Sequence, residues 1–279
     1  MLQKNIIFNS LKETFRLIWK NKSLFLFLFV LQLIFFIIFS FISITYQTKI
    51  LESTKAITEY LSRQNFDESS VAQNILQQKN LLGDDPLSIS RNFNEITKNF
   101  KLYLIYTFIL LIFFISISWA VTNKIIQRTS FKQLTKYFLK VFVVLLFYLG
   151  LIFSFFFSLV NISFIDIGAD ATKLFAKYIP LLIFSIILAY FMFISLSLLN
   201  NTELKSIVQR TLSFGIRKAH YVLSVYSINI LLFIISIVLL FYFIEKNLFI
   251  LLLSLVLMIF SFIFGRIFMV NVIEKLEKN

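Results

Sequence analysis

The stretch SLFLFLFVLQLIFFIIFSFISITYQT, residues 23–48, contains no Asp, Glu, Lys, Arg or His. About 20 consecutive apolar residues are enough to cross a lipid bilayer as an α-helix. Five further stretches of 19 to 25 residues without a charged side chain or histidine follow in the chain. They cover residues 102–123, 141–165, 178–202, 221–244 and 247–265. The sequence therefore predicts six membrane-spanning segments.

The composition predicts that these segments are helices and that the chain is an all-α integral membrane protein. Of the 279 residues, 59% are hydrophobic, and the apolar stretches lack the alternation of polar and apolar residues that barrel strands show. A helix satisfies its own backbone hydrogen bonds in lipid. The first stretch is too long for a secretory signal peptide, and no small-residue cleavage site follows it, so we interpret it as a retained span. The absence of cysteine excludes disulfides and thiolate metal ligands.

The net charge of +13 lies on one side of this predicted topology. The N-terminus, the connectors after the second and fourth spans, and the C-terminal tail together carry 17 basic and 4 acidic residues. The opposite loops carry 10 of each. By the positive-inside rule, we expect both termini to be cytoplasmic and the protein to lie in the cell membrane. No base-reading motif accompanies the charge, so it indicates anionic lipid headgroups and no nucleic acid partner.

The sequence predicts one membrane domain, residues 1–279, with one sizeable insertion. Residues 47–101 have apolar side chains at helical spacing and a turn signal at Gly83–Pro86. They predict an extracytoplasmic helical hairpin inserted between the first and second spans. Asp84 and Asp85 have the chemistry of a cation site, but two carboxylates beside Gly and Pro are more typical of a turn.

Two similar segments precede spans that start on the predicted cytoplasmic side. They are SLKETFRLIWK, residues 10–20, and SFKQLTKYFLK, residues 130–140. On a helical wheel each separates most of its aromatic and aliphatic residues from its basic ones, as interfacial helices do. A third, weaker copy covers residues 207–218, with an apolar stripe opposite two arginines. The pattern predicts three repeated units, each an interfacial amphipathic helix followed by a pair of transmembrane helices.

This layout resembles a loose group of uncharacterised prokaryotic six-helix membrane proteins. The group includes the membrane domain attached to some glycerophosphodiester phosphodiesterases. The resemblance covers nearly the whole chain and is carried by the order of spans together with SLKETFRLIWK and SFKQLTKYFLK. It implies a membrane module and carries over no catalytic residue. We expect no phosphodiesterase domain in this chain, because the spans occupy it.

The candidate site residues are basic side chains that we expect to contact anionic lipid on the cytoplasmic face. They are Lys12, Arg16, Lys20, Lys132, Lys136, Lys140, Arg210, Arg217, Lys218 and Arg266. Counting from Leu248 at 1.5 Å per residue places Arg266 near the headgroups, where a snorkelling side chain is favoured over a buried ion site. No catalytic motif, metal-ligand set or cofactor motif is found.

Polar residues inside the spans have two interpretations. Gln32 and Asn229 are expected to hydrogen-bond between helices, with a polar cavity as the alternative. Ser261 and Gly265 form a small-xxx-small pair that allows close helix contact.

Three hypotheses for the function follow. The first is a non-catalytic multi-pass protein that organises lipid or a membrane or cytoplasmic protein partner at the cytoplasmic membrane. The alternative is a transporter or permease subunit for an uncharged or amphiphilic solute, because no charge lies in mid-span. An intramembrane enzyme is the weakest of the three, since no catalytic motif supports it.

Overall fold

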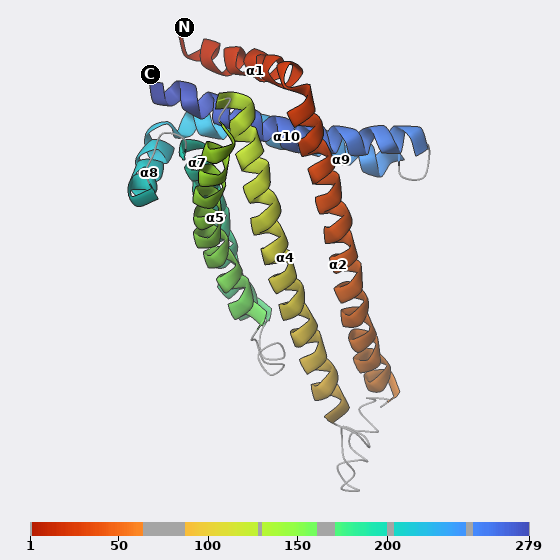
Figure 1. Ribbon diagram of the computed structural model, residues 1–279. Helices are drawn as coiled ribbons and strands as arrows, with labels where there is room; N and C mark the ends of the chain where they lie inside the picture. Colours follow the sequence, from red (N-terminus) through yellow and green to blue (C-terminus); the bar gives the residue numbers. More distant parts are fainter. Residues whose placement is uncertain are drawn as a thin grey trace, which may run out of the picture. The chain divides into compact units, whose positions relative to one another are not determined.

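The computed structural model describes residues 2–63, 87–127, 130–160, 171–199, 204–243 and 248–278. Every regular element in those ranges is helical (Figure 1). The helices are α1 (Leu2–Lys20), α2 (Lys22–Arg63), α4 (Leu87–Gln127), α5 (Phe131–Val160), α7 (Ala171–Leu198), the short 3-10 helix η1 (Leu204–Ser206), α8 (Ile207–Arg217), α9 (Ala219–Phe243) and α10 (Leu248–Lys278).

Six of these helices are long and apolar enough to cross a membrane: α2, α4, α5, α7, α9 and α10. Each carries the centre of one of the six apolar stretches in the sequence. The prediction of an all-α chain with six helices of membrane-spanning length and apolarity is therefore confirmed.

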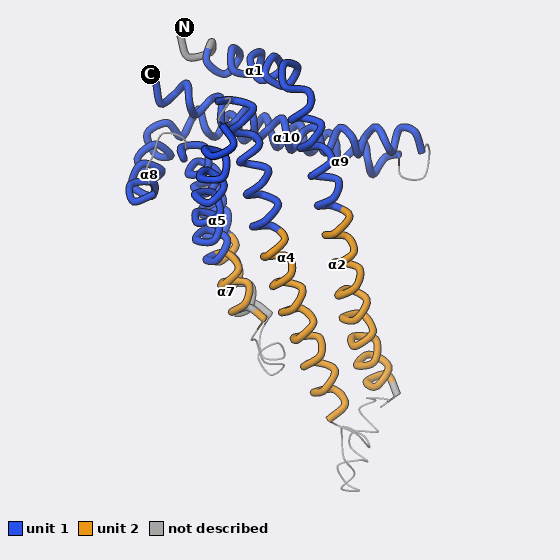
Figure 2. Tube along the Cα trace, in the orientation of Figure 1, with its two compact units in different colours: residues 1–36, 111–151, 183–279 blue, residues 37–110, 152–182 orange. Residues whose placement is uncertain are grey.

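The chain forms two compact units (Figure 2). Unit 1 comprises Met1–Phe36, Leu111–Leu151 and Ile183–Asn279. Unit 2 comprises Ile37–Leu110 and Ile152–Leu182. All the candidate lipid-binding residues lie in unit 1.

Helix α10 is the central element of unit 1. From Ile263 to Ile273 all its side chains except one are buried, and the exception, Arg266, is half-buried. On one side α9 packs against it, with the Ser236 and Ser261 hydroxyls 3.1 Å apart. On another side α1 packs against it. The buried part of α10 therefore holds two elements that are distant in sequence.

The contacts between α2 and α10 show that these helices cross steeply within unit 1. Phe25 and Phe36 lie about three turns apart on α2. Their rings contact Phe260 and Phe262, which are two positions apart on α10, at centroid distances of 5.8 and 6.0 Å. If the two helices ran parallel or antiparallel, contacting residues would be separated by about the same number of positions on both helices. In Figure 1, α9 and α10 accordingly run across this part of α2.

Polar contacts connect α5, α7 and α8 in unit 1. The Ser195 hydroxyl on α7 lies 2.9 Å from both the Tyr148 hydroxyl of α5 and the Thr211 hydroxyl of α8. The Tyr190 hydroxyl of α7 donates to the Gly215 carbonyl of α8 at 2.8 Å. Buried hydroxyls are normally hydrogen-bonded, and here the partners lie on neighbouring helices.

Unit 2 contains the other parts of α2, α4, α5 and α7. Tyr46 of α2 stacks on Tyr106 of α4, with ring centroids 5.8 Å apart. The Ser43 and Tyr103 hydroxyls of the same two helices are 3.4 Å apart. Helices α2 and α4 run through both edges of the predicted 47–101 hairpin, but residues 64–86, including Asp84 and Asp85, lie outside the described residues. The hairpin stays a prediction.

The three predicted interfacial segments differ in their structure. Helix α1 is separated from α2 by a turn at Asn21, whose side-chain amide donates to the Leu17 carbonyl at 2.9 Å. Helix α8 likewise ends before Lys218, and α9 follows. The second segment, residues 130–140, is not a separate helix, because α5 continues without interruption from Phe131 to Val160. The sequence around Lys140 and Val141 contains no glycine, proline or capping residue that would end the helix there.

Candidate anion-binding surfaces and pocket

The three basic residues predicted on α1 lie together on one exposed side of that helix. Lys12, Arg16 and Lys20 are exposed and line an open groove of about 490 Å³. Lys275 of α10 also lines this groove and forms an ion pair with Glu13. The structure therefore brings four cationic groups to one groove, of which the sequence predicted three.

Helix α1 is positioned by a polar contact that was not predicted from the sequence. Ser10 and Thr14 are fully buried against α10. The buried Asn271 donates from its side-chain amide to the Ser10 carbonyl at 3.1 Å and to the Thr14 hydroxyl at 3.4 Å. The Thr14 hydroxyl itself donates to the Ser10 carbonyl at 2.8 Å. The signal available in the sequence was Asn271 within the apolar run from Ile267 to Ile273.

Because the polar side of α1 is docked, its large apolar residues stay outside. Phe8, Phe15 and Trp19 are 67%, 51% and 74% exposed. On the helical wheel these three residues form one apolar arc with Leu11 and Ile18. Ile18, from the same arc, is buried. Lys22 lies over the Trp19 ring with its ammonium 4.1 Å from the ring centroid. Helix α1 thus presents aromatic rings and positive charge side by side.

The basic residues at the start of α5 lie beside a polar pocket. Lys132 and Lys136 are exposed and Lys140 is half-buried. Lys136 and Lys140 line a pocket of about 230 Å³ together with Asn123 and Gln127 of α4. The pocket brings two of the three predicted lysines to one place and leaves Lys132 outside its lining.

Helix α8 presents the same combination as α1 in a shorter form. Arg210 and Arg217 are exposed, and Arg210 pairs with Glu277 of α10 at 3.2 Å. The opposite side exposes an apolar stripe at a spacing of four: Val208, Leu212 and Ile216 of α8, preceded by Leu204 of η1. Between these two sides, Thr211 and Gly215 are buried against α7. Lys218 follows as the C-terminal cap of α8.

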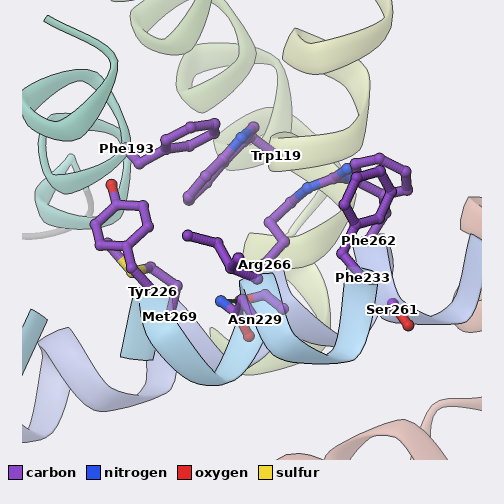
Figure 3. Close-up of a pocket in the computed structure, with 11 residues that line it drawn as sticks. Trp119, Phe193, Tyr226, Asn229, Phe233, Ser261, Phe262, Arg266 and Met269 are labelled. Carbon is purple, nitrogen blue, oxygen red and sulfur yellow. Dashed lines mark hydrogen bonds between the residues drawn. The ribbon is translucent and has the colours of Figure 1, made fainter. Parts of the chain in front are cut away.

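Arg266, the last predicted residue, lies in a different environment from the surface position expected. It lines a pocket of about 270 Å³ among α4, α7, α9 and α10, all within unit 1 (Figure 3). The walls are mostly aromatic or aliphatic and contain Trp119, Phe193, Tyr226, Asn229, Ile230, Phe233, Ser261, Phe262, Gly265 and Met269. The sequence prediction used only the distance of Arg266 along α10. It could not show that Trp119 of α4 and Phe193 of α7 line the same pocket as Arg266.

Two polar atoms in this pocket have no hydrogen-bond partner among the described residues. They are Nη1 of Arg266 and Oδ1 of Asn229, and both are enclosed. The Asn229 amide nitrogen donates to the Gly265 carbonyl at 3.2 Å. Asn229 therefore joins α9 to α10, as expected from the sequence. It also lines this pocket, but the walls are mostly apolar and do not form the polar cavity of the alternative interpretation.

The part of the chain that the structure describes contains no group of three or more His, Cys, Asp or Glu side chains placed to hold a metal ion. His220, the single histidine, is exposed at the start of α9, with its ring 4.1 Å from that of Tyr221.

Comparison of the chain with protein-family models, curated proteins and solved structures finds no match. The resemblance to the membrane domain attached to some glycerophosphodiester phosphodiesterases therefore stays an expectation from layout.

Proposed function

We propose that this chain is a non-catalytic multi-pass protein of the cell membrane that gathers anionic lipid on its cytoplasmic side. The observation that carries the proposal is the docking of α1. Its buried polar residues hold it on α10, while Phe8, Phe15 and Trp19 stay exposed beside the groove of Lys12, Arg16 and Lys20.

This arrangement suits the headgroup region of a bilayer. Exposed aromatic rings are stable where one side is apolar and the other is wet. Each basic residue near an anionic membrane surface gains about 1 kcal/mol. Lys22 over Trp19 places a further charge directly above one of the rings. A helix in water would gain nothing from exposing these rings, so the exposed side of α1 favours contact with lipid.

Helix α8 supports the same function independently. Its apolar stripe of Val208, Leu212 and Ile216 is exposed on one side, and Arg210 and Arg217 are exposed on the other. Under the proposed orientation, with both termini cytoplasmic, α1 and α8 lie on the same side of the membrane. Two elements would then contact the same leaflet.

The test compares two triple variants of the whole protein, purified in a non-ionic detergent. Lys12, Arg16 and Lys20 are changed to glutamine in one, and Lys49, Lys55 and Lys98 in the other. Both lose the same charge, but the second set lies in unit 2. Each protein is titrated with equimolar phosphatidylglycerol and phosphatidylcholine, and bound lipid is counted by native mass spectrometry.

We expect the α1 variant to lose its preference for phosphatidylglycerol by at least about tenfold, since three contacts of about 1 kcal/mol each are removed. The unit 2 variant should keep the preference. Equal retention by the two variants would refute the proposal.

A second candidate function is a permease for an amphiphilic solute, and the pocket around Arg266 favours it. Reconstituted protein would then move a labelled amphiphile between leaflets faster than protein-free vesicles. A rate equal to that of empty vesicles leaves lipid binding as the function.

A further inference from the structure

The pocket around Arg266 contains a charge without a counter-charge. Nη1 of Arg266 is enclosed and has no hydrogen-bond partner within the described part of the chain. A guanidinium has five N–H donors and stays charged. Enclosing such a donor without an acceptor is unfavourable, and buried charges in proteins are normally paired. The site therefore has an unmet requirement for an anion.

The position of Arg266 shows where that anion would bind. Its side chain extends past Trp119 to the rings of Phe233 and Phe262, which line the pocket (Figure 3). Guanidinium groups bind the oxygens of carboxylates and phosphates, often through two parallel hydrogen bonds. An oxyanion in this pocket would satisfy the charge and the open donor together.

The rest of the pocket requires an apolar group. Aromatic rings and aliphatic side chains supply most of its lining. A free inorganic anion would gain the contact with Arg266 but would lose its hydration at these apolar walls, which are stabilised by apolar contact. A ligand with one oxyanion and an apolar chain fits both parts of the lining.

We propose that this pocket is a binding site for a single acidic amphiphile, a carboxylate or phosphate attached to an apolar tail, with Arg266 as the anion-binding residue. The site is separate from the α1 groove and does not depend on the lipid gathering proposed above. A fatty acid anion and a lipid phosphate share this chemistry, so the headgroup is left to the experiment.

The protein provides its own reporter. Its two tryptophans are Trp19, exposed on α1, and Trp119, which lines the pocket. In a Trp19→Phe background, fluorescence comes from Trp119 alone. Dibromostearate, a fatty acid anion whose bromine atoms quench tryptophan, is the probe. Its methyl ester has the same tail without the charge and controls for partition into the detergent micelle.

We expect dibromostearate to quench Trp119 saturably at a concentration at least about tenfold below that of the methyl ester, because a hydrogen bond to a charged group is strong. Arg266→Gln should remove this difference, and Arg91→Gln, which changes an exposed arginine in the unit 2 part of α4, should keep it. Laurate and dodecyl phosphate then compete with the probe. The stronger competitor identifies the headgroup, and either result supports the proposal.

Three results would overturn the proposal. The first is equal quenching by acid and ester in the Trp19→Phe protein with Arg266 intact, a result that needs no folded Arg266 variant. The second is retention of the full difference in Arg266→Gln. The third is displacement of dibromostearate by inorganic phosphate as effectively as by dodecyl phosphate, which would make the site one for a free anion. None of these measurements reports on the α1 groove, so failure here leaves the lipid proposal standing.

Discussion

Changing Asn271 to alanine should release α1 from α10 while the rest of unit 1 stays folded. The side chain of Asn271 is 5% exposed, and its amide makes two hydrogen bonds to α1. The bond to the Ser10 carbonyl, at 3.1 Å, has ordinary length, whereas the bond to the Thr14 hydroxyl, at 3.4 Å, is long. The variant keeps the bond between Thr14 and Ser10, because both partners belong to α1.

The magnitude follows from these contacts. A net hydrogen bond contributes about 0.5–1.5 kcal/mol, and interhelical bonds in membrane proteins average about 0.6 kcal/mol. The two bonds together give roughly 1–2 kcal/mol, and the loss of buried side-chain volume adds to this. A total of about 2 kcal/mol corresponds to roughly a thirtyfold shift in the docking equilibrium of α1.

The assay is hydrogen exchange followed by mass spectrometry on the whole protein in detergent, because local opening of a helix appears as faster exchange of its amides. Amides of residues 10–20 should exchange at least about tenfold faster in Asn271→Ala, and those of α9 should not change. Asn271→Leu keeps the volume and removes the hydrogen bonds, so it separates the two contributions. Glu13→Gln is the control, since its pair with Lys275 is partly exposed and should contribute less than about 1 kcal/mol.

Two outcomes would refute this reasoning. Exchange of α1 within about twofold of the unmutated rate would mean that the polar contact does not hold the helix. Equal acceleration in α1 and α9 would mean that Asn271 stabilises the whole unit and does not dock one helix.

Two further predictions concern packing in unit 1, and both are measured as the midpoint of thermal unfolding in detergent. Gly215→Ala should destabilise by about 1–3 kcal/mol, because the added Cβ would lie 2.8 Å from Cε1 of Phe191. Gly150→Ala, where nothing lies within 4 Å of the added Cβ, should be neutral or stabilising by up to about 1 kcal/mol; equal effects at both sites would contradict this account. Tyr148→Phe should cost about 0.5–1 kcal/mol, because Ser195 keeps its threonine partner; a loss above about 2 kcal/mol would show that the three hydroxyls act as one network.

The six long helices could be predicted because their signal is local. A stretch such as residues 23–48 has no charge over enough residues to span a bilayer, and this property depends on composition alone. The crossing of α2 and α10 has no such signal, since the apolar composition of a helix does not specify its angle to a neighbouring helix. Only the pairing of Phe25 and Phe36 with two close positions on α10 reveals it.

The candidate site was predictable in part for the same reason. Helical periodicity placed Arg16 and Lys20 opposite the apolar arc and Lys12 at the edge of that arc, and the structure brings all three to one groove. Periodicity could not identify the side of α1 that packs against α10. It favours burial of the apolar arc, whereas the buried side contains the polar residues Ser10 and Thr14. Burial of polar residues depends on a partner, and here the partner is Asn271, more than 250 residues away.

The two kinds of anion contact proposed for this protein suit different tasks. The cations of the α1 groove are exposed, so solvent and salt screen them and each contact contributes little. Such a groove would favour anionic lipids as a class over zwitterionic ones without discriminating among the anionic lipids. Nη1 of Arg266 is enclosed in a pocket lined mostly by apolar side chains, where an ionic hydrogen bond is stronger.

A short length of α10 positions both of these proposed anion-binding sites. The ring of Phe264 lies 4.9 Å from that of Phe15 on α1, and the next two residues, Gly265 and Arg266, line the pocket. Asn271, less than two turns further on, holds α1 in place. The buried part of α10 thus positions both α1, the helix proposed to contact lipid, and the proposed amphiphile pocket. A ligand bound to Arg266 would stabilise the same turn of α10 that packs against α1.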